Sequence, residues 1–376
     1  MDADVIVLGA GPAGAIAALV LARAGARVTM LDRAAFPRDK LCGDTINPGA
    51  RATLRRLGLE DALAGGLGVD GMIVTGEGGV RVTGRYEGGR QGVALQRRVL
   101  DQRLAAAAVA AGATLEERVR VQGPVLAPDG QTVIGVEVLL PSGRGQRYTA
   151  PVTIAADGRY SRVARALQLT RTPTRPRRWA VGALFENVLG LSSFGEMHVR
   201  RGRYIGVAPL PGGYTNSCVV TDDRDLLRAA DLLLRTLRSD PETASRFAAA
   251  RMVSPPSVLG PLALDATSAG VPGLLMAGDA AGFVDPMTGD GLRFAFRGGE
   301  LAAEHALWTL DGGWQDAHLR LAQARGREFA TKWRFNRTLR FVAASPAALR
   351  AAAFGATLSP ALLRQVICYA GDAALA

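Results

Sequence analysis

Residues 5–14 read VIVLGAGPAG, and this stretch decides the fold of the chain. The apolar run that ends at Leu8 is typical of a buried parallel strand. An Ala- and Leu-rich stretch follows the glycines and stops at Gly25, which predicts a helix. A second apolar run over 27–31 ends at Asp32. Strand, glycine loop, helix and strand in this order predict a βαβ unit of the Rossmann type.

Each glycine of the loop has a separate task in such a unit. Gly9 permits the tight turn, Gly11 lets the backbone approach a pyrophosphate, and Gly14 allows the helix to pack closely on the strand. The helix N-terminus offers free N–H groups and the positive end of its dipole to the phosphates. Asp32, 23 residues after Gly9, is placed to accept a hydrogen bond from a ribose hydroxyl. A glycine turn in an unrelated α/β protein is the alternative, and the motif does not separate FAD from NAD.

A second glycine and acid cluster, GDAAGFVDPMTGDGL, occupies 278–292 and follows a buried apolar run. FAD is long, so its ribityl chain and flavin need a second binding segment that a simple NAD dehydrogenase lacks. Asp279 is expected to bind ribityl hydroxyls, or the pyrophosphate through its backbone. Gly289 and Gly291 let the backbone approach the flavin, and a helix that starts near Leu292 offers another positive terminus. A turn-rich surface loop is the alternative, and the apolar residues before the cluster speak against it.

The composition excludes several classes of protein. The chain has 376 residues, 48% of them hydrophobic, and a net charge of +11 that is almost all arginine. No basic block with interleaved aromatics is present, so we expect no nucleic-acid partner. Three separated cysteines and three histidines predict neither a disulfide framework nor a metal site. No apolar run is long enough to span a membrane and no leader precedes the first strand, so a cytoplasmic protein is expected.

The order of the segments predicts a discontinuous cofactor domain. Residues 178–221 alternate between apolar and polar in the manner of an antiparallel sheet, and they lie between two pieces of the dinucleotide fold. Residues 224–251 are predicted to be helical. The expected fold is α/β, with a Rossmann-type FAD-binding domain, an inserted antiparallel-sheet substrate domain and a helical C-terminus. The expected boundaries are 1–70, 97–177 and 260–312 for the FAD-binding domain, 71–96 and 178–259 for the substrate domain, and 313–376 for the C-terminal helical region.

Four ordered motifs resemble one family of flavoproteins. They are GAGPAG at 9–14, FPRDKLCGD at 36–44, AADGRYSRVAR at 155–165, and GDAAGFVDPMTGDGL at 278–292. Together they are similar to the geranylgeranyl-reductase-like branch of the p-hydroxybenzoate-hydroxylase superfamily, over roughly residues 1–310. The resemblance implies a glutathione-reductase-like fold of the p-hydroxybenzoate-hydroxylase type. Asp32 stands where many relatives carry Glu, and either side chain can accept a hydrogen bond from ribose.

The resemblance extends the set of expected FAD-binding residues. Arg97 fits an arginine near the pyrophosphate, Asp157 belongs to an Asp-Gly motif that contacts the cofactor, and Val119 fits a position that contacts adenine. The full expected set is Gly9, Gly11, Pro12, Ala13, Gly14, Asp32, Arg33, Arg38, Arg97, Val119, Asp157, Gly278, Asp279, Pro286, Gly289, Gly291 and Leu292.

The same resemblance places Cys42, Gly43 and Asp44 beside the flavin, at the border of the substrate cavity. These three residues are the candidates for a catalytic role. The alternative for Cys42 is a small buried side chain that fills space. A redox disulfide is not expected, because no second cysteine is near in sequence.

Two reaction types share this scaffold, and both leave the chemistry to the flavin. A reductase transfers a hydride to a C=C bond of a lipophilic molecule; a monooxygenase hydroxylates an aromatic or polyketide-type substrate through a flavin hydroperoxide. FPRDKLCGD, and Phe283 in place of the histidine of aromatic hydroxylases, favour the reductase. Prenyl reductases carry Tyr-x-Trp-x-Phe-Pro where this chain has Tyr204, Gly206 and Ala208, so these cavity residues put a prenyl substrate in doubt.

Other functions remain as alternatives. A halogenase is disfavoured, since neither Lys40 nor Lys332 lies in a suitable segment and no Trp-x-Trp motif is present. A flavin-binding protein without turnover would show no reduction by NAD(P)H, and NAD(P)H or another reduced donor is the expected electron source. The arginine-rich C-terminal helices, with Trp333 and Phe341, could cap a lipophilic tunnel or contact a membrane or carrier protein. A core-packed helix with a solvated arginine face is the favoured interpretation of that segment.

Overall fold

Strand β1 (Val5–Leu8) lies at the centre of a six-stranded sheet in the computed structural model, and all four of its residues are buried. It pairs in parallel with β2 and with β12, so that Val5 lies opposite both Val28 and Val152. Burial on both faces explains why the strand is apolar throughout. The strand order is β21-β22-β12-β1-β2-β8, with bounds β2 Val28–Leu31, β8 Thr114–Glu116, β12 Val152–Ala155, β21 Gly270–Val271 and β22 Leu274–Met276.

Helices cover one face of this sheet. α1 (Pro12–Arg23) packs against α6 (Gly291–Gly312) so closely that a methyl group on Gly299 would lie 2.2 Å from the Ala13 carbonyl oxygen. The other helices of this layer are α2 Pro48–Arg56, α3 Arg97–Ala110 and α7 Ala317–Ala344. The short helix α4 Arg162–Ala166 packs on the opposite face, against β9. The structure describes residues 1–174, 177–227, 230–345 and 359–372, together with 347–348, 350–351 and 354–355.

Small sheets complete the cofactor-binding layer. Three antiparallel strands pack against the β12 region, and two further sheets of three and two strands join distant loops. Their bounds are β9 Arg120–Leu126, β10 Val133–Leu139, β11 Gly145–Thr149, β3 Thr45–Ile46, β4 Leu67–Val69, β7 Gly92–Ala94, β13 Thr170–Arg171 and β20 Asp265–Ala266.

A larger, eight-stranded sheet joins two segments that are far apart in sequence. Its order is β18-β14-β17-β16-β15-β5-β6, with β19 paired to β14, and β15 is parallel to β5. The bounds are β5 Gly71–Thr75, β6 Arg81–Arg85, β14 Trp179–Glu186, β15 Phe194–Arg200, β16 Arg203–Pro209, β17 Thr215–Thr221, β18 Arg251–Met252 and β19 Ser257–Leu259.

The helix predicted over 224–251 is shorter than expected. Among the described residues of this range, α5 (Ala230–Ser239) is the one α-helix; a single 3-10 turn (Asp225–Leu227) precedes it and turns follow it. Pro241 supplies the physical reason, because a proline disfavours helical geometry at the preceding Asp240 and donates no backbone hydrogen bond.

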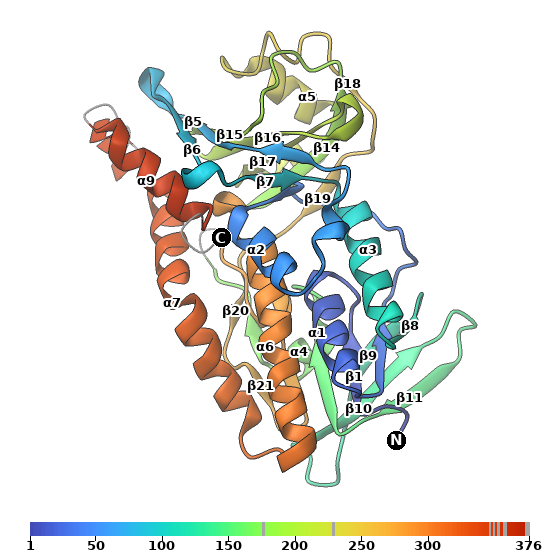
Figure 1. Cartoon of the computed structure of the whole chain (residues 1–376). Coiled ribbons are helices and arrows are strands. Elements are labelled where there is room, and N and C mark those ends of the chain that lie inside the picture. Colours follow the sequence, from blue (N-terminus) through green and yellow to red (C-terminus); the bar gives the residue numbers. More distant parts are fainter. Residues whose placement is uncertain are drawn as a thin grey trace.

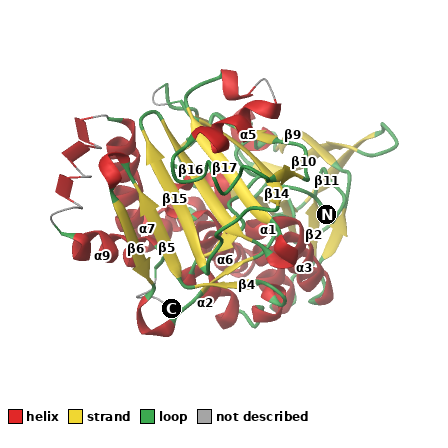
Figure 2. Ribbon diagram, turned by 90° about the horizontal axis from the view of Figure 1, so that it is seen from above, coloured by secondary structure: helices red, strands yellow, loops and turns green. Residues whose placement is uncertain are grey.

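The eight-stranded sheet lies across the end of the cofactor-binding layer where α1 and α6 begin, and α5 covers its outer side (Figure 1). Seen from above, its strands form a broad twisted layer that lies over the helices (Figure 2). The long helix α7 runs beside both layers, and α9 (Pro360–Ala370) packs on β6. No helix in the described part of the chain is long and apolar enough to cross a membrane.

Candidate FAD and substrate site

A cavity of about 910 Å³ lies between the two layers. The glycine loop, the segments around 38–47 and 156–162, the loop 278–292 and the inner face of the large sheet all contribute to its wall. Of the residues expected to bind the cofactor, all line this cavity except Gly14. The structure therefore brings five distant segments of the chain to one place.

Gly14 lies in the first turn of α1, behind the cavity wall, and its role is to let the helix pack closely on the glycine loop. A methyl group added to it would lie 1.8 Å from the carbonyl oxygen of Gly9, so only glycine permits this approach of helix to loop. Gly9 itself has φ +86, a left-handed conformation that disfavours any side chain. The N-terminus of α1 at Gly11 has no side-chain cap, which leaves its N–H groups for an anion in the cavity.

The carboxylate of Asp32 is held in place at the end of β2. Its Oδ2 accepts a hydrogen bond from Ala10 N–H at 2.8 Å, and its Oδ1 accepts one from Ala34 N–H at 2.9 Å. Each oxygen keeps a second lone pair, and the residue lines the cavity although it is only 6% exposed. A ribose hydroxyl therefore remains a suitable donor to Asp32.

Two arginines share one buried acid at the wall. Arg97 binds Asp101 through two hydrogen bonds of 2.7 and 2.8 Å, and Arg38 Nη1 lies 3.2 Å from the same carboxylate. Asp101 is completely buried, so this pairing fixes both guanidinium groups. Two cations against one anion leave a surplus of positive charge that suits a pyrophosphate.

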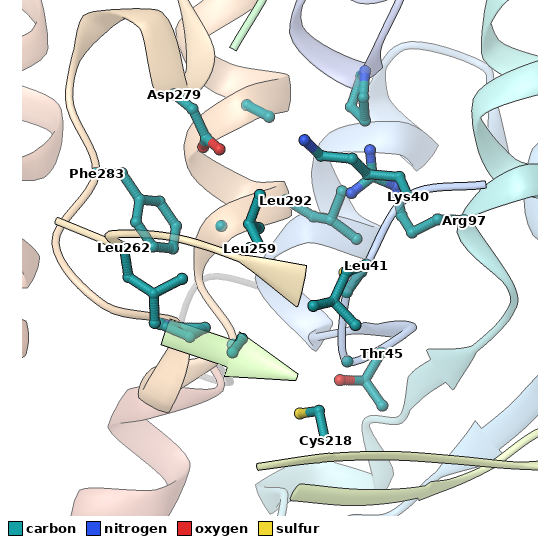
Figure 3. A pocket seen from close by; sticks show the side chains of 18 of the residues that line it. Lys40, Leu41, Thr45, Arg97, Cys218, Leu259, Leu262, Asp279, Phe283 and Leu292 are labelled. Atoms are coloured by element: carbon teal, nitrogen blue, oxygen red, sulfur yellow. The ribbon is translucent and has the colours of Figure 1, made fainter. Parts of the chain in front are cut away.

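Lys40 and Arg97 face Asp279 and Phe283 across the cavity (Figure 3). Asp279 Oδ2 lies 3.5 Å from Nη2 of Arg159, and the Arg159 guanidinium stacks on the Phe283 ring at 4.7 Å. Burial lowers the pKa of Lys40, and the attraction of Asp279 opposes this shift. The acid expected to bind the ribityl chain thus sits among cations.

Two features at this cavity show that it fits a polar cofactor. Oδ1 of Asp157 is buried and has no hydrogen-bond partner among the residues that the structure describes, and burial raises the pKa of this carboxyl to about 6. At the N-terminus of α6, Asp290 makes no side-chain cap, and a methyl group on Gly289 or Gly291 would meet no backbone within 4 Å. These residues would suit FAD: the N-terminus of α1 could hold a phosphate group, and the N-terminus of α6 could hold another polar part of the cofactor.

Of the three candidate catalytic residues, Cys42 and Gly43 line the cavity. Asp44 does not. It is 5% exposed behind the wall, where Oδ1 accepts from Arg97 N–H at 3.0 Å and Oδ2 accepts from Asn216 Nδ2 at 2.6 Å. Both carboxylate oxygens are used to hold the loop in place, so Asp44 positions the residues before it.

A second cysteine lines the same cavity as Cys42, which sequence distance did not predict. Cys218, on β17, contributes to this wall, and both thiols are free. Burial raises the pKa of Cys42, although the neighbouring Arg97 opposes the shift, and burial raises the pKa of Cys218 to about 12. Both thiols therefore keep their protons at neutral pH, which disfavours a thiolate nucleophile.

Tyr204, Gly206 and Ala208 lie on β16 and all face the cavity. The Tyr204 hydroxyl donates to Asp285 Oδ1 at 2.7 Å. Burial, followed by the Asp285 charge, raises the pKa of Tyr204 well above its usual value, so the phenol stays protonated. A methyl group on Gly206 would meet Cys218 Sγ at 3.3 Å and otherwise enters open space.

The C-terminal helices form an apolar arm of the cavity that the sequence motifs did not reveal. Leu339 and Val342 of α7 and Val366 and Ile367 of α9 line it. Other apolar residues of the wall are Met72, Val74, Met197 and Val199 of the large sheet and Val69 of β4. Trp333 packs on the hydrophobic core, as the favoured prediction for this segment stated. Leu339 lines the cavity instead, as the alternative of a helix that caps a lipophilic tunnel would have it.

Lys332 joins this C-terminal segment to the loop at 285–292. It is 4% exposed, and its ammonium lies 3.3 Å from Asp290 Oδ1 and 3.0 Å from Asp372 Oδ1. It also donates to the carbonyl oxygens of Tyr369 and Ala370, the last residues of α9. One buried cation thus connects the start of α6 with the end of α9.

The comparisons with known proteins agree with this geometry. The FAD binding domain family matches residues 2–228. A menaquinone reductase of Mycobacterium tuberculosis is 33% identical over 81% of this chain and 76% of its own length, and a digeranylgeranylglycerophospholipid reductase of Methanothermobacter thermautotrophicus is 30% identical over 83% and 79%. The conditioned medium factor receptor 1 of Dictyostelium discoideum is 30% identical over 80% of this chain, which spans 62% of that protein.

Solved structures share the fold. A geranylgeranyl bacteriochlorophyll reductase-like protein of Thermoplasma acidophilum has a TM-score of 0.79 at 21% identity, covering 91% of this chain and 87% of its own. The myxobacterial chondrochloren halogenase has a TM-score of 0.81 at 23% identity, covering 89% and 81%. At these identities the likeness concerns the fold alone.

The chain therefore belongs to the FAD binding domain family, and it is an FAD-dependent oxidoreductase. The resemblance to the geranylgeranyl-reductase-like branch, expected from four motifs, is confirmed by these relatives.

Proposed function

We propose that the enzyme reduces a C=C bond of a lipophilic small molecule, with NAD(P)H or another reduced donor as the source of electrons. FAD, when bound, supplies the hydride chemistry, and the chain supplies binding, orientation and shelter from water. Hydride would add to one carbon of the double bond and a proton from solvent to the other.

The apolar arm of the cavity carries this proposal. Beyond the loops that suit FAD, the wall contains aliphatic and thioether side chains from the large sheet and from α7 and α9, beside the polar residues Tyr204, Glu196 and Asn216. Such a compartment favours a hydrophobic substrate because it removes apolar surface from water, at about 25 cal/mol per Å². It offers little to a small polar phenol.

The residues near the flavin loops agree with a reductase. Phe283 lines the cavity where a histidine is found in aromatic hydroxylases, and its ring is covered by Arg159. The raised pKa of Tyr204 keeps its hydroxyl protonated, and this hydroxyl donates its hydrogen bond to Asp285. The ring therefore forms part of the cavity wall, and the phenol does not serve as a proton donor to the substrate. The names of the reductase relatives also denote lipophilic substrates.

The test compares two fates of the reduced enzyme. The protein is reduced without oxygen and mixed with a menaquinone or with a geranylgeranyl glycerolipid, and flavin reoxidation and product mass are followed. Reoxidation that needs the lipid, with a product that gains a pair of hydrogens and keeps them after any quinol has been reoxidised to quinone, supports the proposal. If reoxidation requires oxygen and the product of an aromatic substrate gains an oxygen atom, the enzyme is a monooxygenase. A flavin that dithionite reduces, but that NAD(P)H does not reduce and no substrate reoxidises, would indicate a protein without turnover.

A further inference from the structure

We propose that the outer surface of the C-terminal helices binds an anionic membrane, in which a lipophilic substrate would be dissolved. We call this the C-terminal surface, and we define it by Arg334, Arg337, Phe341, Leu362 and Arg364. The inference rests on the proposed function, because it states where a lipophilic substrate would come from.

The positive charge of the protein is concentrated in this segment. Between Glu328 and Asp372 the sequence contains no acidic residue, yet it carries six cations: Lys332, Arg334, Arg337, Arg340, Arg350 and Arg364. This is more than half of the net charge of +11. Cations close to an anionic bilayer are attracted to it within about one Debye length, roughly 8 Å at physiological salt.

The arginines of the C-terminal surface differ from many others in the chain in having no carboxylate partner among the described residues. Arg56, Arg97, Arg200 and Arg246 each bind a carboxylate directly. In the described part of the chain no carboxylate lies within ion-pair distance of Arg334, Arg337 or Arg364, all of which are exposed.

Large apolar side chains are exposed between these arginines. Phe341 of α7 is 69% exposed and Leu362 of α9 is 60% exposed. Phe354, in the segment that joins the two helices, is 66% exposed. Among the described residues, Phe341 and Phe354 are the only phenylalanines that are exposed. Aromatic and aliphatic side chains among arginines are the pattern of a helix that lies in a membrane interface.

The two helices that carry this surface also form the inner wall of the cavity. α7 and α9 meet where the rings of Phe335 and Tyr369 contact edge to face at 4.9 Å. Leu339, Val342 and Val366 line the apolar arm on the inner side. A molecule dissolved in a bilayer beneath Phe341 would therefore be separated from the apolar arm only by the helices themselves.

Neither helix is long and apolar enough, in its described part, to span a bilayer, so the contact would be peripheral. An acidic carrier protein is the other partner that the arginines could attract. The exposed Phe341 and Leu362 favour the membrane, because a bilayer interface accepts apolar side chains without needing a complementary pocket.

The test measures binding of the flavin-loaded protein to vesicles in the absence of substrate. One set contains equal parts of phosphatidylglycerol and phosphatidylcholine, the other phosphatidylcholine alone, and sedimentation gives the bound fraction. An immobilised acyl carrier protein is used as the acidic-protein probe. The first variant is the double substitution Phe341→Ser and Leu362→Ser, with Leu319→Ser as the control, since Leu319 is 49% exposed at the far end of α7.

The second variant removes charge, as Arg334→Gln, Arg337→Gln and Arg364→Gln together. Its control removes three exposed arginines elsewhere that also have no ion pair in the described part of the chain, Arg118, Arg144 and Arg201, so that the net charge is the same. We expect the wild-type protein to bind the anionic vesicles. Each C-terminal variant should bind them about tenfold more weakly, and the two control variants should bind as the wild type does.

Three results would overturn the inference: no binding to anionic vesicles, equal loss in variant and control, or binding to the carrier protein alone. None of them concerns turnover, which is measured separately with a dispersed short-chain substrate. Loss of vesicle binding with full turnover of that substrate in the two variants separates the inference from the proposed function.

Discussion

The carboxylate of Asp44 accepts a hydrogen bond of 2.6 Å from the side-chain amide of Asn216, a residue 172 positions later in the chain. Asn216 also donates to the carbonyl oxygen of Cys42 at 2.9 Å. One amide on β17 therefore holds the loop that carries Cys42 and Gly43 against the large sheet. Asp44 has φ +53, a conformation that Asp and Asn accept better than most residues.

Replacement of Asp44 by Asn should change how stability depends on pH. Burial raises the pKa of Asp44 to about 6, against a usual 3.8, despite the opposing Asn216 hydrogen bond. Between these values the folded state binds a proton that the unfolded state does not, so the contribution of Asp44 to the free energy of unfolding is largest at low pH and is lost as pH rises through about 6. The variant should thus gain stability relative to wild type from pH 4 to pH 7, by on the order of 3 kcal/mol. Denaturant titrations at several pH values measure this, and a difference that stays constant with pH would contradict the assignment.

Replacement of Gly14 by Ala should remove FAD and lower the melting temperature. The new methyl group would lie 1.8 Å from Gly9 O, and neither the loop nor α1 can move without disturbing the other. Overpacking of this kind costs roughly 1–3 kcal/mol or more. Gly123→Ala is the control, since a methyl group there meets nothing within 4 Å. Flavin content after gel filtration and a thermal melt report the two effects, and retention of FAD at wild-type level would show that the close approach is dispensable.

Replacement of Asp279 by Ala should weaken FAD retention without unfolding the protein. An acceptor expected to bind the ribityl hydroxyls would be lost, at a cost of about 1–3 kcal/mol. Asp265→Ala, a partly exposed acid on β20, is the control. Fluorescence titration of the stripped protein with FAD gives the affinity, and an unchanged value would exclude Asp279 from the FAD site.

Enlargement of Gly206 or Ala208 should block the substrate and spare the flavin. Gly206→Trp and Ala208→Phe add a ring on the cavity face of β16, at positions distant in sequence from the loops that suit FAD. We expect turnover of the lipophilic substrate to fall while FAD content and spectrum persist. A thermal melt separates this from overpacking, which costs roughly 1–3 kcal/mol. Joint loss of stability and flavin would mean that both residues face the core.

The cofactor half of the site was predictable because its residues occur in local motifs. Gly9, Gly11 and Asp32 are fixed by the spacing of one βαβ unit, and Asp279 and Gly291 by one loop. The substrate half was not predictable in this way. Leu339 and Val366 reach the cavity only because α7 and α9 pack on the large sheet, and a helix with one apolar stripe has the same sequence whether it faces a core or a cavity.

Asp44 and Cys218 also show that local sequence motifs do not predict which side chains reach the cavity. The motif placed Asp44 beside the flavin, but a carboxylate whose oxygens are both used by Arg97 and Asn216 is turned away from the cavity. Cys218 was remote from Cys42 in sequence and lines the same wall in space. Contacts across 170 or more residues depend on the relative placement of the two layers, which no local pattern encodes.

The buried ammonium of Lys332 makes the two halves of the site thermodynamically dependent on each other. It lies between Asp290, at the loop that begins α6, and Asp372, at the end of α9, which also pairs with Arg293. If Lys332 lost contact with either carboxylate, a buried ionic contact that joins the loop to α9 would be lost, which is unfavourable. By reciprocity, a cofactor that orders the loop raises the affinity of the cavity for any ligand that needs α9 docked, and that ligand raises the affinity for the cofactor by the same factor. Cofactor retention and substrate affinity should therefore rise and fall together when this one lysine is disturbed.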